Sequence, residues 1–290
     1  MKYMFLSLRP KQWIKNLFIF LPLIFGKKMF VFPSNLRTIA AFFVFSMVAS
    51  AVYLINDIID YEKDKLHPTK CQRPFASGKI GNVQMIVAAC ILSVLSFVSA
   101  FMLDGFFGWI VVSYFVFNLV YTKVLKEVVI IDIFSIAGFF LLRIIAGCII
   151  SSTAISHWII FMTILLALFL GFNKRRGELQ ILGEKAKLHR IVLTKYSTYF
   201  IDQMIAVITS SVVIVYMLYT IDNRTLNEFG SNHLMYSIPF VYYGIFRYLY
   251  LVHKINKDGD PTTILFSDRN MRLNLALWIV VCILVIYFGF

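Results

Sequence analysis

Nine apolar runs follow one another along the chain, and the short segments between them hold most of the charged residues. Each run is about long enough to cross a hydrocarbon layer roughly 30 Å thick as a helix, which satisfies its own backbone hydrogen bonds there. The pattern therefore predicts an all-α integral membrane protein of about nine transmembrane helices, with residues 1–290 forming a single membrane-embedded domain. The predicted spans are residues 16–32, 39–55, 83–103, 106–121, 128–150, 158–172, 199–220, 234–251 and 273–290.

The positive charges divide unequally between the two sides that nine spans would create. Of the 28 Lys and Arg residues, 23 fall on the side of the N-terminus and 4 on the other side, while Arg143 lies within a span. Cytoplasmic loops carry an excess of Lys and Arg, so the rich side is predicted to be cytoplasmic and the protein to be multi-pass in the inner or plasma membrane. The net charge of +13 is thereby explained by orientation and by anionic lipid or phosphate partners, without nucleic-acid binding.

Composition agrees with a membrane location and leaves little room for disulfide or zinc chemistry. The chain is 60% hydrophobic and 15% charged, whereas soluble proteins carry about 25% charged residues. The four cysteines are far apart, and three of them lie in apolar runs. They are interpreted as packing residues.

Acidic residues gather directly after the second predicted span, where the chain reads NDIIDYEKD from Asn56 to Asp64. Asp57, Asp60 and Asp64 follow a spacing of i, i+3 and i+7, which is expected to place their carboxylates on one helical face. Repulsion between them at the membrane edge favours a bound counter-ion, and oxygen ligands of this kind suit Mg²⁺. The alternative is a solvated helix end that Lys63 and Lys65 neutralise.

A basic loop with two prolines follows these acids, so phosphate-seeking cations and carboxylates are presented together. The NDxxDxxxD pattern after a second span resembles the first Asp-rich motif of the UbiA-type prenyltransferase superfamily, whose fold also has nine helices. The resemblance is closer to the polyprenyl-phosphate phosphoribosyltransferase branch. It is carried by three stretches: RPKQWIKN (9–16), DKLHPTKCQRP (64–74) and KRRGEL (174–179).

A second Asp-rich motif, which most superfamily members that bind a prenyl diphosphate carry after the sixth helix, is missing from residues 173–196. Lys174, Arg175 and Glu178 stand there and match the branch's KRxxE pattern. Direct pairing with cations would have to hold a phosphate at this position. The departure argues against an aromatic prenyltransferase and fits a branch whose lipid substrate is a monophosphate.

Other residues are weaker candidates. Lys126 would face phosphate and Tyr121 would offer a hydroxyl in the connection before the fifth span, which loosely resembles the superfamily. Arg143, deep in that span, is interpreted either as a phosphate contact or as a structural cation paired with an acid such as Asp104 or Asp202, and the structural interpretation is favoured.

The resemblance implies that 5-phosphoribosyl passes from 5-phosphoribosyl-1-diphosphate to a polyprenyl monophosphate with Mg²⁺, releasing diphosphate at the cytoplasmic face. The product would serve envelope polysaccharide, as an arabinan precursor. Alternatives are a prenyl diphosphate transferase acting on an aromatic acceptor or haem, and a cation transporter. An oligomer is compatible with the pattern. The expected metal ligands are Asn56, Asp57, Asp60 and Asp64, with Asp57 and Asp60 as catalytic residues. The expected substrate-binding residues are Lys15, Asn16, Lys70, Arg73, Tyr121, Lys126, Lys174, Arg175 and Glu178.

Overall fold

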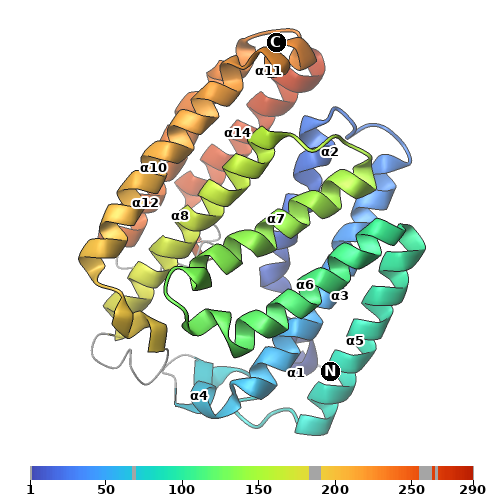
Figure 1. The fold of residues 1–290 in the computed structure, drawn as a ribbon, viewed down its shortest axis with the longest axis vertical. Helices are drawn as coiled ribbons and strands as arrows, with labels where there is room; N and C mark the ends of the chain where they lie inside the picture. The colour runs from blue at the N-terminus through green and yellow to red at the C-terminus, as the bar shows by residue number, and fades with distance from the viewer. Residues whose placement is uncertain (1, 67–69, 183–190, 255–262, 265–266, 290) are drawn as a thin grey trace. The chain divides into compact units, whose positions relative to one another are not determined.

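Helices make up most of the chain that is described by a computed structural model, which covers residues 2–66, 70–182, 191–254, 263–264 and 267–289. No strand occurs within those ranges (Figure 1). This is the expected outcome for an apolar chain in lipid, because each helix pairs its own backbone groups. The longer helices are α3 (Ser34–Ile59), α5 (Asn82–Leu103), α6 (Gly105–Lys123), α7 (Ile131–Ser151), α8 (His157–Leu182), α10 (Thr198–Ile221), α12 (Ile238–Lys254) and α14 (Arg269–Phe288).

Seven helices in the described part of the chain are long and apolar enough to cross a membrane, so the predicted count of nine is not confirmed. The first predicted span is divided into a 3₁₀ helix, η1 (Pro10–Phe20), and a short α-helix, α2 (Leu21–Phe25). Pro10 and Pro22 lie in the first turns of these two elements, where their missing backbone N–H groups are tolerated. The eighth predicted span is divided into the 3₁₀ helix η6 (His233–Ser237) and the 17-residue helix α12.

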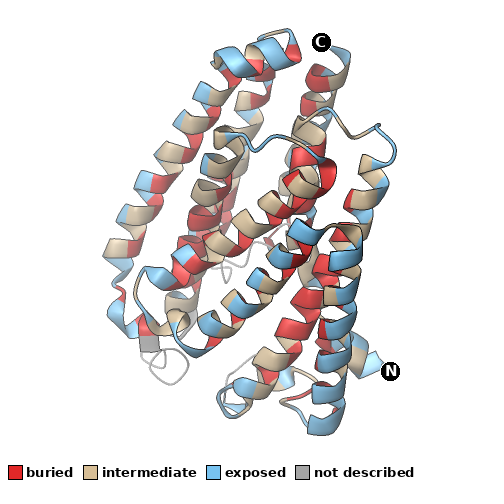
Figure 2. Ribbon diagram, turned by 45° about the vertical axis from the view of Figure 1, so that its right-hand side comes forward, coloured by how far each residue is buried: buried red, intermediate tan, exposed pale blue. Residues whose placement is uncertain are grey.

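The chain forms two compact units. Unit 1 comprises residues 1–135 and 142–154, and unit 2 comprises residues 136–141 and 155–290. In unit 1, α3 packs against α5, α6 and η1. Most of these helices carry both buried and exposed residues (Figure 2). Of the most apolar stretch of α3, 61% is buried, compared with only 22% of that of α5. α3 is therefore the central helix of unit 1, and α5 leaves most of its surface to lipid.

The two ends of unit 1 are identified by contacts between distant segments. At one end, Lys28, which follows α2, donates a hydrogen bond to the carbonyl of Ser151 at the end of α7 (3.1 Å). At the other end, the region after α3 contacts the region after α6 through Asp60 and Lys126. Connections that the sequence assigned to the same side of the membrane therefore lie together in this unit.

Unit 2 is built on two helix pairs, α8 with α10 and α12 with α14. At one end Trp158 of α8 lies near Tyr219 of α10, with ring centroids 6.3 Å apart. Between α10 and α14, the indole of Trp278 donates a hydrogen bond to the Tyr216 hydroxyl (3.0 Å). The Tyr216 hydroxyl and the Trp278 indole are thus paired across helices, as an apolar environment favours.

Gly147 of α7 is expected to tolerate no side chain, because η1 passes directly over it. A Cβ at this position would lie 2.3 Å from the backbone oxygen of Ile19, and backbone cannot rotate away as a side chain can. We expect Gly147→Ala to lower stability by about 1–3 kcal/mol, measured as the thermal unfolding midpoint in detergent.

Gly105→Ala is the matched control for this prediction. Gly105 begins α6 in the same unit, and a Cβ there would meet nothing within 4 Å. This variant should match or exceed the stability of the natural protein, because Ala favours helix more than Gly by about 1 kcal/mol. Equal stability of the two variants would contradict the close approach of η1 to α7.

Candidate active site

The acidic segment lies where α3 ends. α3 stops at Ile59, Asp60 adopts a non-helical turn (φ −92°, ψ 9°), and the short helix α4 (Tyr61–Lys65) follows. In a continuous helix of 100° per residue, a residue three positions after Asp57 is about 60° off its direction, whereas one seven positions later is about 20° off. Asp57 and Asp64 are therefore better aligned with each other than either is with Asp60.

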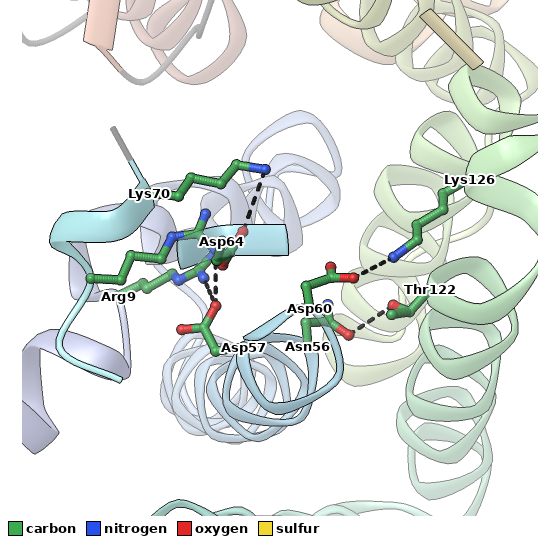
Figure 3. Close-up of polar contacts among 9 residues, drawn as sticks. Arg9, Asn56, Asp57, Asp60, Asp64, Lys70, Thr122 and Lys126 are labelled. Atoms are coloured by element: carbon green, nitrogen blue, oxygen red, sulfur yellow. Dashed lines mark hydrogen bonds and ion pairs between the residues drawn. The ribbon is translucent and has the colours of Figure 1, made fainter. Parts of the chain in front are cut away.

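Asp57 and Asp64 form one side of the cluster, together with two arginines (Figure 3). Both carboxylates are buried, with side chains 4% exposed. Arg73 Nη1 contacts Asp57 Oδ1 at 3.0 Å and also pairs with Asp64 Oδ2. Arg9 Nη2 pairs with the same Asp57 Oδ1. Lys70 adds a longer ion pair, with its Nζ 3.9 Å from Asp64 Oδ1.

Asp60 and Asn56 form the other side of the cluster and face α6 and the segment after it (Figure 3). Lys126 Nζ donates to Asp60 Oδ1 at 2.8 Å, and the Thr122 hydroxyl donates to Asn56 Oδ1 at 2.7 Å. The expectation that all three carboxylates share one face is therefore wrong for Asp60. The physical reason is its offset of about 60° from Asp57 around the helix, which turns it toward Lys126 in the segment after α6.

The donor chemistry on the Asp57 side fits a divalent ion. One atom, Arg73 Nη1, contacts both Asp57 and Asp64, so two carboxylates already converge on a single positive group. Mg²⁺ in proteins commonly takes one or two carboxylates and completes its shell with water and substrate phosphates. Within the described residues, no group of three or more acidic, His or Cys side chains is placed to hold a metal ion. A site here would therefore use this pair of carboxylates.

Arg9 lies in this cluster but was not among the residues predicted from the sequence, although it belongs to the RPKQWIKN stretch that carried the family resemblance. Its guanidinium pairs with Asp57 and lies 5.0 Å from the centre of the Tyr53 ring. Burial lowers the pKa of the Arg9 guanidinium, and the Asp57 carboxylate opposes that shift. The group stays protonated, because guanidinium is not deprotonated in proteins. An arginine beside a proline before the first helix was the available signal.

Asn16 has a structural position deeper in unit 1. It is 1% exposed, its side-chain nitrogen donates to Ser46 Oγ at 3.0 Å, and its Oδ1 accepts from Arg143 Nε at 2.8 Å. Arg143 also donates to the Tyr114 hydroxyl at 2.9 Å. Asn16 and Tyr114 thus stand where an acidic partner was expected. Lys15 is half-buried in η1.

The acids proposed as partners of Arg143 are engaged elsewhere. Asp104 accepts a hydrogen bond from the backbone N–H of Phe107 at the start of α6 (3.0 Å), and Arg37 lies 4.0 Å from it. Asp202 pairs with Arg176 at 2.5 Å within unit 2. The structural interpretation of Arg143 agrees with these contacts, but the partners named for it were wrong.

The remaining predicted residues belong to α6 or to unit 2. Tyr121 is half-buried near the end of α6. In unit 2, Lys174, Arg175 and Glu178 lie in the last turns of α8, and Arg175 Nη1 pairs with Glu178 Oε2 at 2.5 Å. Arg175 is 1% exposed. The basic residues 183–190 of the following loop lie outside the described residues.

Comparison with known proteins identifies the fold and the family. The UbiA prenyltransferase family matches residues 18–175. The decaprenyl-phosphate phosphoribosyltransferase of Mycobacterium tuberculosis is 30% identical over 98% of this chain and 94% of its own length. The enzyme of the same name from Corynebacterium glutamicum is 30% identical over 97% and 86%.

Among solved structures, a UbiA homolog from Archaeoglobus fulgidus bound to GPP and Mg²⁺ has a similar fold. The TM-score is 0.72 at 17% sequence identity, with 98% of this chain and 99% of that chain covered. The expectation of an all-α, multi-pass membrane protein with a UbiA-like fold is thus confirmed, as is the expectation of a transferase. The chain belongs to the UbiA prenyltransferase family.

Proposed function

We propose that this protein transfers 5-phosphoribosyl from 5-phosphoribosyl-1-diphosphate to a polyprenyl monophosphate. The observation that carries the proposal is the set of basic side chains that contact the acidic segment. Arg9, Lys70 and Lys126 each contact one of three carboxylates and Arg73 contacts two of them. Four cations thus lie against three acids, so positive charge exceeds negative charge by one there. Such a site favours anionic, phosphorylated substrates. The name shared by the relatives from Mycobacterium tuberculosis and Corynebacterium glutamicum supports the same reaction.

We further propose that the carboxylates of Asp57 and Asp64 hold a divalent ion. Asn56 and Asp60 lie on the other side of the acidic cluster. The Archaeoglobus fulgidus homolog was solved with Mg²⁺ and with Cd²⁺, which supports the use of a divalent metal in this fold. A bound ion would neutralise charge that builds on the departing diphosphate. Asn56, fixed by Thr122, would orient this side of the site.

The side chains of the protein would position the two phosphorylated partners. The bond between the ribose C1 and the diphosphate oxygen breaks, and the diphosphate leaves with the electron pair. A phosphate oxygen of the lipid then bonds to the same carbon. Because the lipid phosphate is already an anion at neutral pH, no strong general base is required. Lys70, Arg73 and Lys126 would bind phosphate oxygens, and correct placement accounts for much of the rate gain.

The family resemblance also implies substrate-binding roles for three residues of unit 2. Lys174 and Arg175 would bind phosphate, and Glu178 would orient Arg175 through their ion pair. The chain has no second Asp-rich motif after α8, which counts against a prenyl diphosphate donor. The positive-charge distribution supports a site on the cytoplasmic face, where a lipid in the bilayer can meet a soluble sugar diphosphate.

The assay for this proposal combines purified protein in detergent, radiolabelled 5-phosphoribosyl-1-diphosphate and a polyprenyl phosphate. We expect labelled lipid in the presence of Mg²⁺. With EDTA the rate should fall by about 100-fold or more, because the diphosphate would depart without charge neutralisation. Adding excess Mg²⁺ back should restore the rate, which separates metal removal from denaturation.

Two outcomes of this assay would contradict the proposal. The first is labelled lipid formed equally fast with EDTA, which would remove the metal. The second is an absence of labelled lipid together with turnover of geranyl diphosphate and an aromatic acid, which would favour a prenyl diphosphate transferase.

A further inference from the structure

Arg9 and Arg73 bind one oxygen of each carboxylate of the proposed metal site. Asp57 Oδ1 accepts from both guanidinium groups, and Arg73 Nη1 also binds Asp64. The negative charge of the two buried carboxylates is therefore already balanced by two guanidinium groups, and the Lys70 ammonium lies 3.9 Å from Asp64 as well. The acids cannot present these oxygens to another cation until the arginines give them up.

Arg9 has a geometry that would allow it to change partner. Its backbone is in the left-handed region (φ 53°, ψ 57°), and the ring of Pro10 restricts the backbone that follows. The side chain can therefore change its contacts while the backbone keeps its direction. The guanidinium lies over the ring of Tyr53. Tyr53 and Asp57 are four residues apart on α3 and so lie on the same face. A rotation of the guanidinium away from Asp57 can therefore keep the contact with Tyr53.

The charge balance favours such a change only when an anion is present. A divalent cation brought alone to Asp57 and Asp64 would add two positive charges beside two guanidinium groups, in a place where little water screens them. Diphosphate brought with the cation would restore the balance and offer oxygens to the displaced arginines. Charge-assisted hydrogen bonds from Arg to phosphate oxygens are among the strongest in proteins.

We infer that Arg9 and Arg73 exchange the carboxylates of Asp57 and Asp64 for diphosphate oxygens, so that the metal ion and diphosphate bind cooperatively. The inference rests on the proposed metal site. Each ligand favours the same arrangement of the arginines, so each must raise the affinity for the other by an equal factor. Arg9 is then a positioning residue for the metal ion and a binding residue for diphosphate.

The test measures Mn²⁺ affinity, by electron paramagnetic resonance of purified protein in detergent. Inorganic diphosphate is absent or present, and free Mn²⁺ is buffered to the same concentrations in both series. We expect diphosphate to tighten Mn²⁺ binding by roughly 5- to 150-fold. Equal Mn²⁺ affinity in the two series, or no Mn²⁺ binding in either, would overturn the inference.

Arg9→Gln tests the exchange itself. Because one cation is removed from Asp57, this variant should bind Mn²⁺ more tightly than the natural protein when diphosphate is absent, and diphosphate should tighten its binding by a smaller factor. Arg9→Lys keeps the charge and should restore most of the coupling, which a merely structural role would not predict. Weaker Mn²⁺ binding by Arg9→Gln without diphosphate would refute the exchange.

Arg37→Gln is the matched control, since Arg37 also lies near an aspartate in unit 1, Asp104 at 4.0 Å, and stands near the start of α3 while Asp57 stands near its end. Its Mn²⁺ affinity and coupling should equal those of the natural protein. This experiment contains no sugar donor and no lipid. Coupled binding without phosphoribosyl transfer would therefore refute the proposed reaction alone, and transfer without coupled binding would refute the exchange alone.

Discussion

Replacing Asp57 by Asn is expected to lower the rate of phosphoribosyl transfer by about 1,000-fold or more. Asp57 is buried and accepts from both Arg9 and Arg73, so its negative charge balances two guanidinium groups. An amide has nearly the same shape but cannot neutralise those groups or bind a divalent ion as a carboxylate does. The measurement is the radiolabelled transfer assay with Mg²⁺, at equal amounts of folded protein.

Asp104→Asn is the control for this variant. Asp104 is also an aspartate near an arginine in unit 1, and an Asn there can still accept the backbone hydrogen bond at the start of α6. We expect its transfer rate to stay within about twofold of the natural protein, since surface ion pairs contribute little. If Asp57→Asn kept a tenth or more of the natural rate, the assignment of Asp57 to the metal site would be wrong.

The second large effect is expected on stability, at Asn16. Replacing Asn16 by Leu, which has a similar size, removes the acceptor of Arg143 Nε and the donor to Ser46. A hydrogen bond to a charged group contributes about 1.5–3 kcal/mol, and loss of the acceptor leaves a buried donor. We expect the variant to be about 2–3 kcal/mol less stable, seen as a lower unfolding midpoint in detergent.

Asn118→Leu separates this effect from the general cost of replacing a buried Asn. Asn118 is 7% exposed in α6, and its side-chain nitrogen donates to the Tyr114 carbonyl of the same helix at 2.8 Å. A bond within one helix should be worth about 1 kcal/mol or less. Equal midpoints for the two variants would show that Asn16 does not hold Arg143.

Several properties of the site could be predicted from the sequence because they depend on neighbouring residues. The acids of the NDIIDYEKD segment follow an apolar span directly, so their place at the end of α3 needs no knowledge of other helices. Lys70 and Arg73 follow within the next loop and were correctly expected beside them. Lys126 was expected at the same end because alternate connections share a side of the membrane.

The partner of each acid could not be predicted in this way. Arg9 and Asp57 are 48 residues apart, and Asp60 and Lys126 are 66 residues apart. Asn16 and Arg143 are separated by 127 residues. Spacing along a helix says nothing of such pairs, because they form only when separate helices pack at a particular rotation and depth.

The sequence by itself determined that this protein lies in a membrane, that it is helical, and which segment is proposed to carry its chemistry. Apolar runs must become helices in lipid, since no other local structure pairs the backbone there. The tertiary structure decided the rest: a 3₁₀ helix and a short α-helix in place of the first span, Asp60 turned toward Lys126, and arginines on Asp57 and Asp64. Each of these depends on close contact between distant segments, as where Ile19 lies against Gly147 with no room for a side chain.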